Sequence, residues 1–106
     1  MEELEINEKN FKDEVLSKEK FVLLEFFGTW CMPCKMESKI LDKVEEEHKD
    51  VRVVRLDIDK NMNLAKEYGV MTVPTMLFFK DEFECEKTVG FRQFNQINEI
   101  LNKYKD

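Results

Sequence analysis

The feature that most restricts the fold is the run FVLLEFF at residues 21–27. Its side chains are apolar on both alternating faces of an extended chain, with Glu25 as the exception. A strand with two apolar faces is typical of the centre of a sheet that is covered on both sides. The run is too short to span a membrane, which takes about 20 apolar residues in a helix. We therefore expect a layered α/β domain built around this strand.

The patterns on either side of this run alternate between strands and helices. Gly69 is expected directly after one helix, and Pro74 directly before a buried strand. Because the strands first alternate with helices and then end in a hairpin, we expect a central five-stranded mixed sheet with four helices on its two faces. The expected strands are Leu4–Ile6, 21–27, 51–58, 75–80 and 83–89, and the expected helices are a short one capped by Asn7 and Asn10, then about 32–48, 61–68 and 92–104.

The helix after Cys31 has an amphipathic pattern. Its buried face is expected to carry Met36, Ile40, Leu41 and Val44. Its face in water is expected to carry Glu37, Lys39, Asp42, Lys43 and Glu45–Glu47.

Length and charge limit the class of protein. A chain of 106 residues is expected to form one domain, residues 1–106. The net charge of −6 argues against a nucleic acid or an anionic membrane as partner. The first ten residues have neither the basic nor the apolar segment of a secretory signal. We therefore expect a soluble cytoplasmic protein, in a compartment that keeps thiols reduced.

The sequence WCMPC at residues 30–34 holds the candidate chemistry. A C-x-x-C pair can bind a metal, form a permanent disulfide or exchange electrons. A permanent disulfide is rare in a reducing compartment. A metal site would need two further ligands, for which only Cys85 and His48 remain. We therefore expect a redox-active pair, with no metal and no other cofactor.

The position of the pair assigns roles to the two sulfurs. At a strand-to-helix junction, Cys31 would lie at the helix N-terminus, where the dipole favours a thiolate. Cys31 is then the attacking thiol, and Cys34 resolves the mixed disulfide. Glu25 is the expected proton acceptor for Cys34, because desolvation would raise its pKa. The alternative is that Glu25 lies on a solvated face of its strand.

Four segments resemble the thioredoxin family along nearly the whole chain. They are FVLLEFFGTWCMPCKM, VVRLDID, YGVMTVPTMLFFK and TVGF, in this order. The resemblance implies the thioredoxin fold and a protein-disulfide reductase that serves electron transport and cell redox homeostasis. It also implies a monomer that acts on disulfide-containing proteins and is recharged by a separate thioredoxin reductase, since the chain has no G-x-G-x-x-G nucleotide-binding motif.

The resemblance also carries roles to individual positions. Glu25 stands where the family usually has a buried Asp, and Arg55 where a Lys often neighbours that acid. Arg55 is therefore expected to lower the pKa of Glu25. Val73–Pro74 matches a cis-proline loop in which the backbone of Val73 pairs with an extended substrate. The implied substrate-binding residues are Trp30, Met32, Pro33, Val73, Pro74 and Gly90.

One departure from the family pattern lies between the cysteines. Met32 stands where Gly is usual, at a position that tunes the reduction potential in the family. The direction of that effect does not follow from the sequence. Two alternatives therefore remain open: a specialised electron donor or oxidant on the same scaffold, and a binding module with little turnover.

Overall fold

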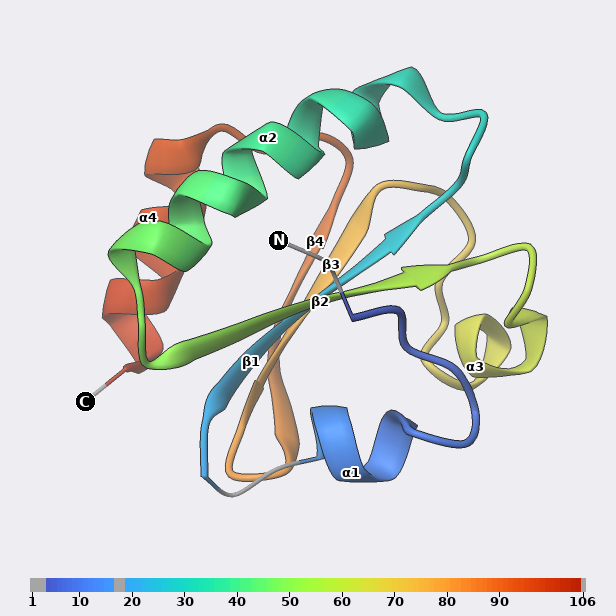
Figure 1. Cartoon of the computed structure of the whole chain (residues 1–106), viewed down its shortest axis with the longest axis horizontal. Coiled ribbons are helices and arrows are strands. Elements are labelled where there is room, and N and C mark those ends of the chain that lie inside the picture. Colours follow the sequence, from blue (N-terminus) through green and yellow to red (C-terminus); the bar gives the residue numbers. More distant parts are fainter. Residues whose placement is uncertain (1–3, 17–18, 106) are drawn as a thin grey trace.

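A computed structural model describes residues 4–16 and 19–105 of the chain. Within these ranges the elements alternate as expected and end in a hairpin and a helix (Figure 1). The strands are β1 (Phe21–Phe27), β2 (Val51–Asp57), β3 (Thr75–Lys80) and β4 (Phe83–Val89). The helices are α1 (Phe11–Val15), α2 (Met32–Glu47), α3 (Met62–Glu67) and α4 (Phe94–Tyr104).

The sheet is mixed, and β1 lies in its interior. The strand order is β2-β1-β3-β4, with β1 parallel to β2 and antiparallel to β3. β3 and β4 form an antiparallel hairpin at one edge. The prediction of a mixed sheet with β1 at its centre and a helix layer on each face is therefore confirmed.

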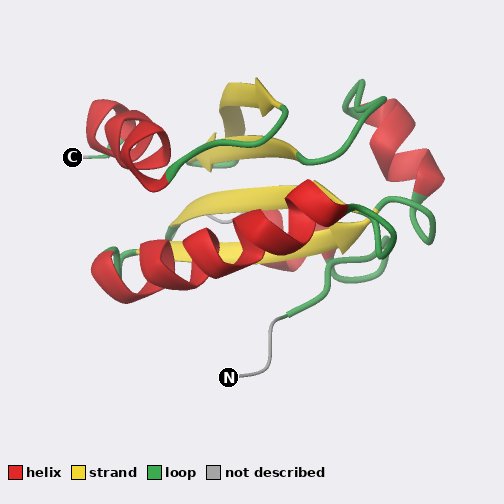
Figure 2. Cartoon of the chain, turned by 90° about the horizontal axis from the view of Figure 1, so that it is seen from above, coloured by secondary structure: helices red, strands yellow, loops and turns green. Residues whose placement is uncertain are grey.

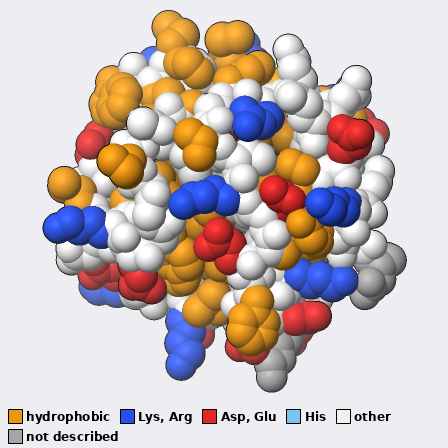
Figure 3. All heavy atoms as spheres, turned by 180° about the vertical axis from the view of Figure 1, so that it is seen from behind, with side chains coloured by type: hydrophobic (Ala, Val, Ile, Leu, Met, Phe, Trp, Pro, Cys, Tyr) orange, Lys and Arg blue, Asp and Glu red, His pale blue; other side chains and the backbone are white. Residues whose placement is uncertain are grey.

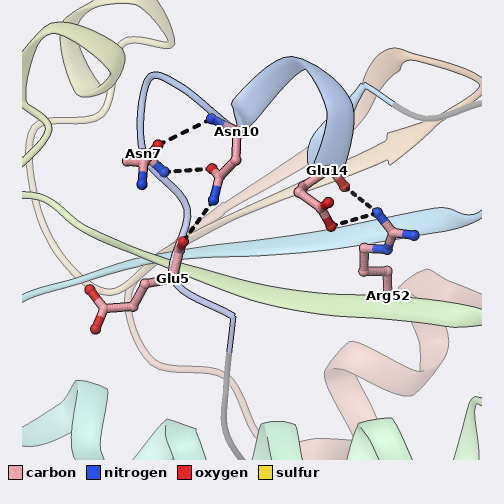
Figure 4. A network of polar contacts seen from close by, with 5 residues as sticks. All are labelled: Glu5, Asn7, Asn10, Glu14 and Arg52. Carbon is pink, nitrogen blue, oxygen red and sulfur yellow. Dashed lines mark hydrogen bonds and ion pairs between the residues drawn. The ribbon is translucent and has the colours of Figure 1, made fainter.

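The prediction of a fifth strand at Leu4–Ile6 is wrong, and over residues 4–16 and 19–105 the sheet has four strands. This segment makes only an isolated parallel bridge between Glu5 and Arg55. A turn begins directly after it, because the backbone N–H of Asn7 donates to Asn10 Oδ1 at 2.8 Å and that of Asn10 to Asn7 Oδ1 at 3.1 Å (Figure 4). The prediction that Asn7 is the N-cap is wrong, because α1 begins at Phe11 and its N-cap is Asn10. The Asn7–Asn10 turn ends the extended segment before it can become a strand.

The alternation of β1 separates two apolar cores. Val22, Leu24 and Phe26 pack with α1 and α3 on one face. Phe21 and Leu23 pack with α2 and α4 on the other. Figure 2 shows α2 running along the strands, with α4 beside it toward the β4 edge. Because side chains alternate along a strand, Glu25 points to the α2 and α4 face.

The ends of two helices are fixed by local chemistry. α4 begins two residues later than expected, because Gln93 and Gln96 form a capping box at its start. Gly69 follows α3 with a φ of +66°, as expected for a residue after a helix C-cap. The Asp81–Glu82 turn between β3 and β4 places two non-glycine residues in the left-handed region, with φ values of 50° and 77°.

The hairpin turn gives a prediction about stability. We expect Glu82→Gly to raise the free energy of unfolding by about 1 kcal/mol, because a left-handed φ costs an L-residue about 1–2 kcal/mol and glycine gives back part of this as unfolded-state entropy. Urea unfolding measures the change. Glu84→Gly is the control within β4, and it should lower stability instead. A loss of stability in Glu82→Gly would contradict the assigned strain.

Candidate active site

The two cysteines lie at the start of α2 and form a disulfide. Cys31 is the N-cap, and its Sγ accepts a hydrogen bond from the backbone N–H of Cys34 at 3.2 Å. Both side chains are buried, with Cys34 slightly more so. Pro33 occupies the first turn, where a missing N–H costs no helical hydrogen bond. The sulfurs therefore lie where the free N–H groups and the dipole of a 16-residue helix favour negative charge.

The turn between β1 and α2 fixes the only tryptophan of the chain. Trp30 is 66% exposed, and its Nε1–H donates to Asp59 Oδ2 at 2.8 Å. A Cβ on Gly28 would lie 2.7 Å from the Trp30 ring, so glycine leaves the space that this ring position needs. Asp59 follows β2 and was not identified from the sequence, since an exposed acid in a polar turn gives no distinctive signal.

The Val73–Pro74 peptide is cis, as the family resemblance implied. The Pro74 carbonyl accepts a hydrogen bond from Gly90 N–H at 2.8 Å, so the loops before β3 and after β4 are joined. Val73 and Trp30 line the same hollow of about 200 Å³. Among the predicted substrate-binding residues, Pro74 is thus hydrogen-bonded to Gly90, and Val73 and Trp30 border one hollow.

A second hollow begins at Met32, which is exposed. It has a volume of about 470 Å³ and is lined by Met32, Lys35, Met36, Lys39, Ile40, Phe91 and Gln93. The prediction that Met36 is buried is wrong, because its side chain is 54% exposed. Seen from behind, hydrophobic side chains gather at the upper end of the molecule, the end at which α2 begins in Figure 1 (Figure 3). Charged side chains are interspersed over the middle of that view.

Glu25 is completely buried, so the solvated alternative is excluded. Its Oε1 accepts a hydrogen bond from Arg55 Nε at 2.7 Å, and the Arg55 guanidinium stacks on Phe27. The pKa of Glu25 is raised to about 9, chiefly by burial and also by a hydrogen bond with Glu37 and the charge of Glu37, against the lowering effect of Arg55. Arg55 acts in the predicted direction, but desolvation outweighs it.

The prediction that Glu37 lies in water is wrong, because this side chain is completely buried. Its Oε2 accepts a hydrogen bond from the backbone N–H of Arg92 at 2.9 Å. The sequence did contain a signal for this burial, namely the helical spacing. Glu37 follows Cys34 by three residues and precedes Leu41 by four, so it lies on the same buried face of α2 as Cys34, Leu41 and Val44.

The remaining candidate ligands lie apart from the disulfide. His48 ends α2 and is hydrogen-bonded to Asn98 Oδ1 at 2.7 Å. Cys85 is a half-buried free thiol on β4, and burial raises its pKa. Among the described residues, no three His, Cys, Asp or Glu side chains form a group that would hold a metal ion. In the same part of the chain, no helix has the length and apolar composition that a membrane crossing requires.

The disulfide position, the cis-proline loop and the order of elements can be compared with known proteins. The family model for thioredoxin matches residues 2–103. The chain belongs to the thioredoxin family. It is 36% identical to the thioredoxin of Rickettsia felis over 99 residues, covering 92% of this chain and 94% of that protein. It is 38% identical to the thioredoxin of Bacillus subtilis over 89 residues, covering 83% and 86% respectively.

The fold agrees with this assignment. A solved structure of a mutant thioredoxin from Halobacterium salinarum is similar, with a TM-score of 0.90 and 29% identity over 99% of this chain and 92% of that one. Thioredoxins are protein disulfide oxidoreductases, and this chain has the cysteine pair that such chemistry uses. It is therefore a thiol–disulfide oxidoreductase.

Glu25 makes the stability of the protein depend on pH. The unfolded chain gives up the Glu25 proton near the ordinary glutamate pKa of 4.5, whereas the folded protein keeps it until about pH 9. The folded state thus binds more protons in this window, so stability falls as the pH rises through it.

We expect Glu25→Gln to gain stability relative to wild type between pH 5 and pH 8, by at most about 1.4 kcal/mol per pH unit. Urea unfolding of the oxidised proteins at both pH values measures this. Glu99→Gln, an exposed acid on α4, is the matched control and should show no such gain. Parallel pH dependences for wild type and Glu25→Gln would refute the assignment.

Proposed function

We propose that this member of the thioredoxin family is a reductant of protein disulfides that cycles Cys31 and Cys34 between dithiol and disulfide. The observation that carries the proposal is the disulfide at the N-terminus of α2, with Cys31 as the cap. The helix terminus stabilises a thiolate, and the thiolate is the form that attacks a disulfide.

In the proposed cycle the Cys31 thiolate attacks one sulfur of a substrate disulfide, and the substrate S–S bond breaks to release the first thiolate. A mixed disulfide then joins Cys31 to the substrate. Cys34 loses its proton and attacks Cys31 Sγ, which releases the second substrate thiolate and forms the Cys31–Cys34 bond. The substrate gains two electrons, and the cysteine pair loses them.

Glu25 is proposed to exchange the proton of Cys34, with Arg55 as the neighbour that tunes it. A raised pKa suits a group that takes up and returns a proton. Arg55 and Cys34 line the same hollow of about 360 Å³ beside α2, which supports a connection between the ion pair and the resolving sulfur.

The proposed substrate-binding surface surrounds the disulfide. The backbone of Val73 would pair with an extended segment of the substrate, and side chains around it would supply apolar contact. The exposure of Trp30 and Met32 supports this arrangement, since exposed large apolar side chains mark interaction sites. The full proposed set is Trp30, Met32, Pro33, Val73, Pro74 and Gly90.

The wider setting is also a proposal. We propose a monomeric, single-domain cytoplasmic protein, residues 1–106, that takes electrons from a thioredoxin reductase and takes part in electron transport and redox homeostasis. The family match over residues 2–103 supports the single domain. The net charge of −6 supports protein substrates rather than nucleic acid or anionic membranes. The disulfide would be the only redox group required.

Reduction of insulin disulfides by dithiothreitol tests the proposed activity. We expect the protein to accelerate it, and the absence of acceleration over dithiothreitol alone would refute turnover. The reduction potential should be about −270 mV for a reductant, whereas a value of about −120 mV would indicate an oxidant.

Single substitutions test the proposed roles of the cysteines. Cys34→Ser should accumulate mixed disulfides with substrate through Cys31, because the resolving thiol is missing. Cys31→Ser should trap little, because Cys34 is more buried. Non-reducing electrophoresis after incubation with insulin measures both. Equal trapping by the two variants would reverse the assignment.

A further inference from the structure

Two buried carboxyl groups come from β1 and from α2, the helix that begins at the disulfide, and among the described residues each has one oxygen without a donor. The side chains of Glu25 and Glu37 are both 0% exposed. Arg55 Nε donates to Glu25 Oε1, and Arg92 N–H donates to Glu37 Oε2. Within the described part of the chain, no donor reaches Glu25 Oε2 or Glu37 Oε1. Leaving buried polar atoms unpaired is costly, so these two oxygens call for an explanation.

An interaction between the two carboxyl groups would explain why Glu25 Oε2 and Glu37 Oε1 have no other donor. Glu25 points from β1 to the face that α2 covers, and Glu37 lies on the buried side of α2, one turn after Cys34. A hydrogen bond with Glu37 is, after burial, the largest cause of the raised pKa of Glu25. A carboxylate only accepts, so the bond exists only when one member carries a proton.

Charge balance also indicates that Glu25 and Glu37 together hold one proton. The charged groups acting on Glu25 among the described residues are Arg55 from β2 and Glu37 from α2. β3 places Met76 beside Glu25, and α4 buries Ile97 and Leu101 on this face. Two carboxyls, one guanidinium and one proton are together neutral, which is the arrangement that a low-dielectric interior favours.

We propose that Glu25 and Glu37 form a pair that stores one proton behind Cys34, and that Glu37 is the positioning residue that keeps a carboxylate oxygen vacant for the Cys34 proton. The inference deepens the proposed function and rests on it. Glu25 by itself would have no vacancy at neutral pH, that is, no unprotonated carboxylate to accept the Cys34 proton, because it already holds a proton. Before resolution the pair has one, because two carboxyls share that single proton.

The pair fits into the resolution step as follows. The Cys34 thiol gives its proton to the vacant oxygen, so that both carboxyls become protonated. The electron pair of the Cys34 thiolate forms the new bond to Cys31 Sγ. The bond from Cys31 to the substrate breaks, and the substrate thiolate leaves with the electron pair of that broken bond. The second proton then passes to solvent or to the leaving thiolate. Arg55 borders the same hollow as Cys34, so positive charge faces the transient thiolate.

Titration of Glu25 tests the pair without any turnover. The measurement is the ¹³C signal of the Glu25 carboxyl in oxidised protein, assigned by its loss in Glu25→Gln. In Glu37→Gln the midpoint should fall by about one pH unit or more, because the like charge and the acceptor for the protonated form are both gone. The Gln oxygen can still accept from Arg92 N–H, so a merely structural role would leave the midpoint unchanged.

Two further variants complete the titration experiment. Glu37→Met removes both the charge and the hydrogen-bond acceptor of the carboxyl, so the Glu25 midpoint should fall here too. This variant serves as the test if Glu37→Gln does not fold. Glu46→Gln, an exposed acid on the same helix, should leave the Glu25 midpoint in place. An unchanged midpoint in the folded Glu37 variants would overturn the pair.

A single-turnover assay tests the vacancy. Reduced protein is mixed with an aromatic disulfide whose first coloured thiolate leaves on attack by Cys31 and whose second leaves on resolution by Cys34. The second phase of Glu37→Gln should be slower than wild type by about tenfold at pH 6 and should approach wild type by pH 9, where Glu25 is ionised and can accept the proton itself.

The ratio of the second-phase rates of wild type and Glu37→Gln, measured as a function of pH, separates the outcomes. A ratio that is constant with pH, or an unchanged second phase, would overturn the vacancy even if the midpoint of Glu25 falls. Absence of both phases in wild type would instead refute the proposed function, and the titration would still decide whether the pair exists.

Discussion

The interior position of β1 is the constraint on which the other parts of the site depend. This strand is paired along both edges and covered on both faces, so its residues have almost no freedom to shift. A slip by one residue would exchange the two apolar cores and place Glu25 against α1 and α3. The end of β1 therefore fixes Gly28, the tryptophan turn and the first cysteine in turn. The register of β1 therefore determines the position of the redox site.

Burying a carboxyl in that strand costs free energy that the rest of the sheet must offset. Arg55 lies directly opposite Glu25 on β2 and meets half of its hydrogen-bonding needs. A chain selected for stability alone would have an apolar side chain here, since burial raises the pKa of Glu25 and so disfavours its charged form. This cost falls on the sheet face that α2 covers, and α2 begins at the disulfide. Local stability is commonly given up for chemistry in such regions.

The sequence predicted those features that depend on local patterns. The apolar run of β1 and the C-x-x-C motif at its end placed the disulfide at a helix N-terminus, and the hairpin and last helix followed from their own periodicity. The first strand failed because the competing Asn7–Asn10 turn is a local alternative of similar weight. Charge alone assigned Glu37 to water, whereas its burial depends on Glu25 and on the Arg92 backbone, which come from distant parts of the chain.

The hydrogen bond from Trp30 to Asp59 has a consequence for how the protein can be observed. Trp30 is the only tryptophan in the chain, and it directly precedes the first cysteine. Its indole is tied to the turn after β2 rather than free to rotate. Intrinsic fluorescence excited at the red edge of protein absorption therefore comes from one fixed ring at the rim of the disulfide. The unlabelled protein carries its own optical probe of the oxidation state and occupancy of this site.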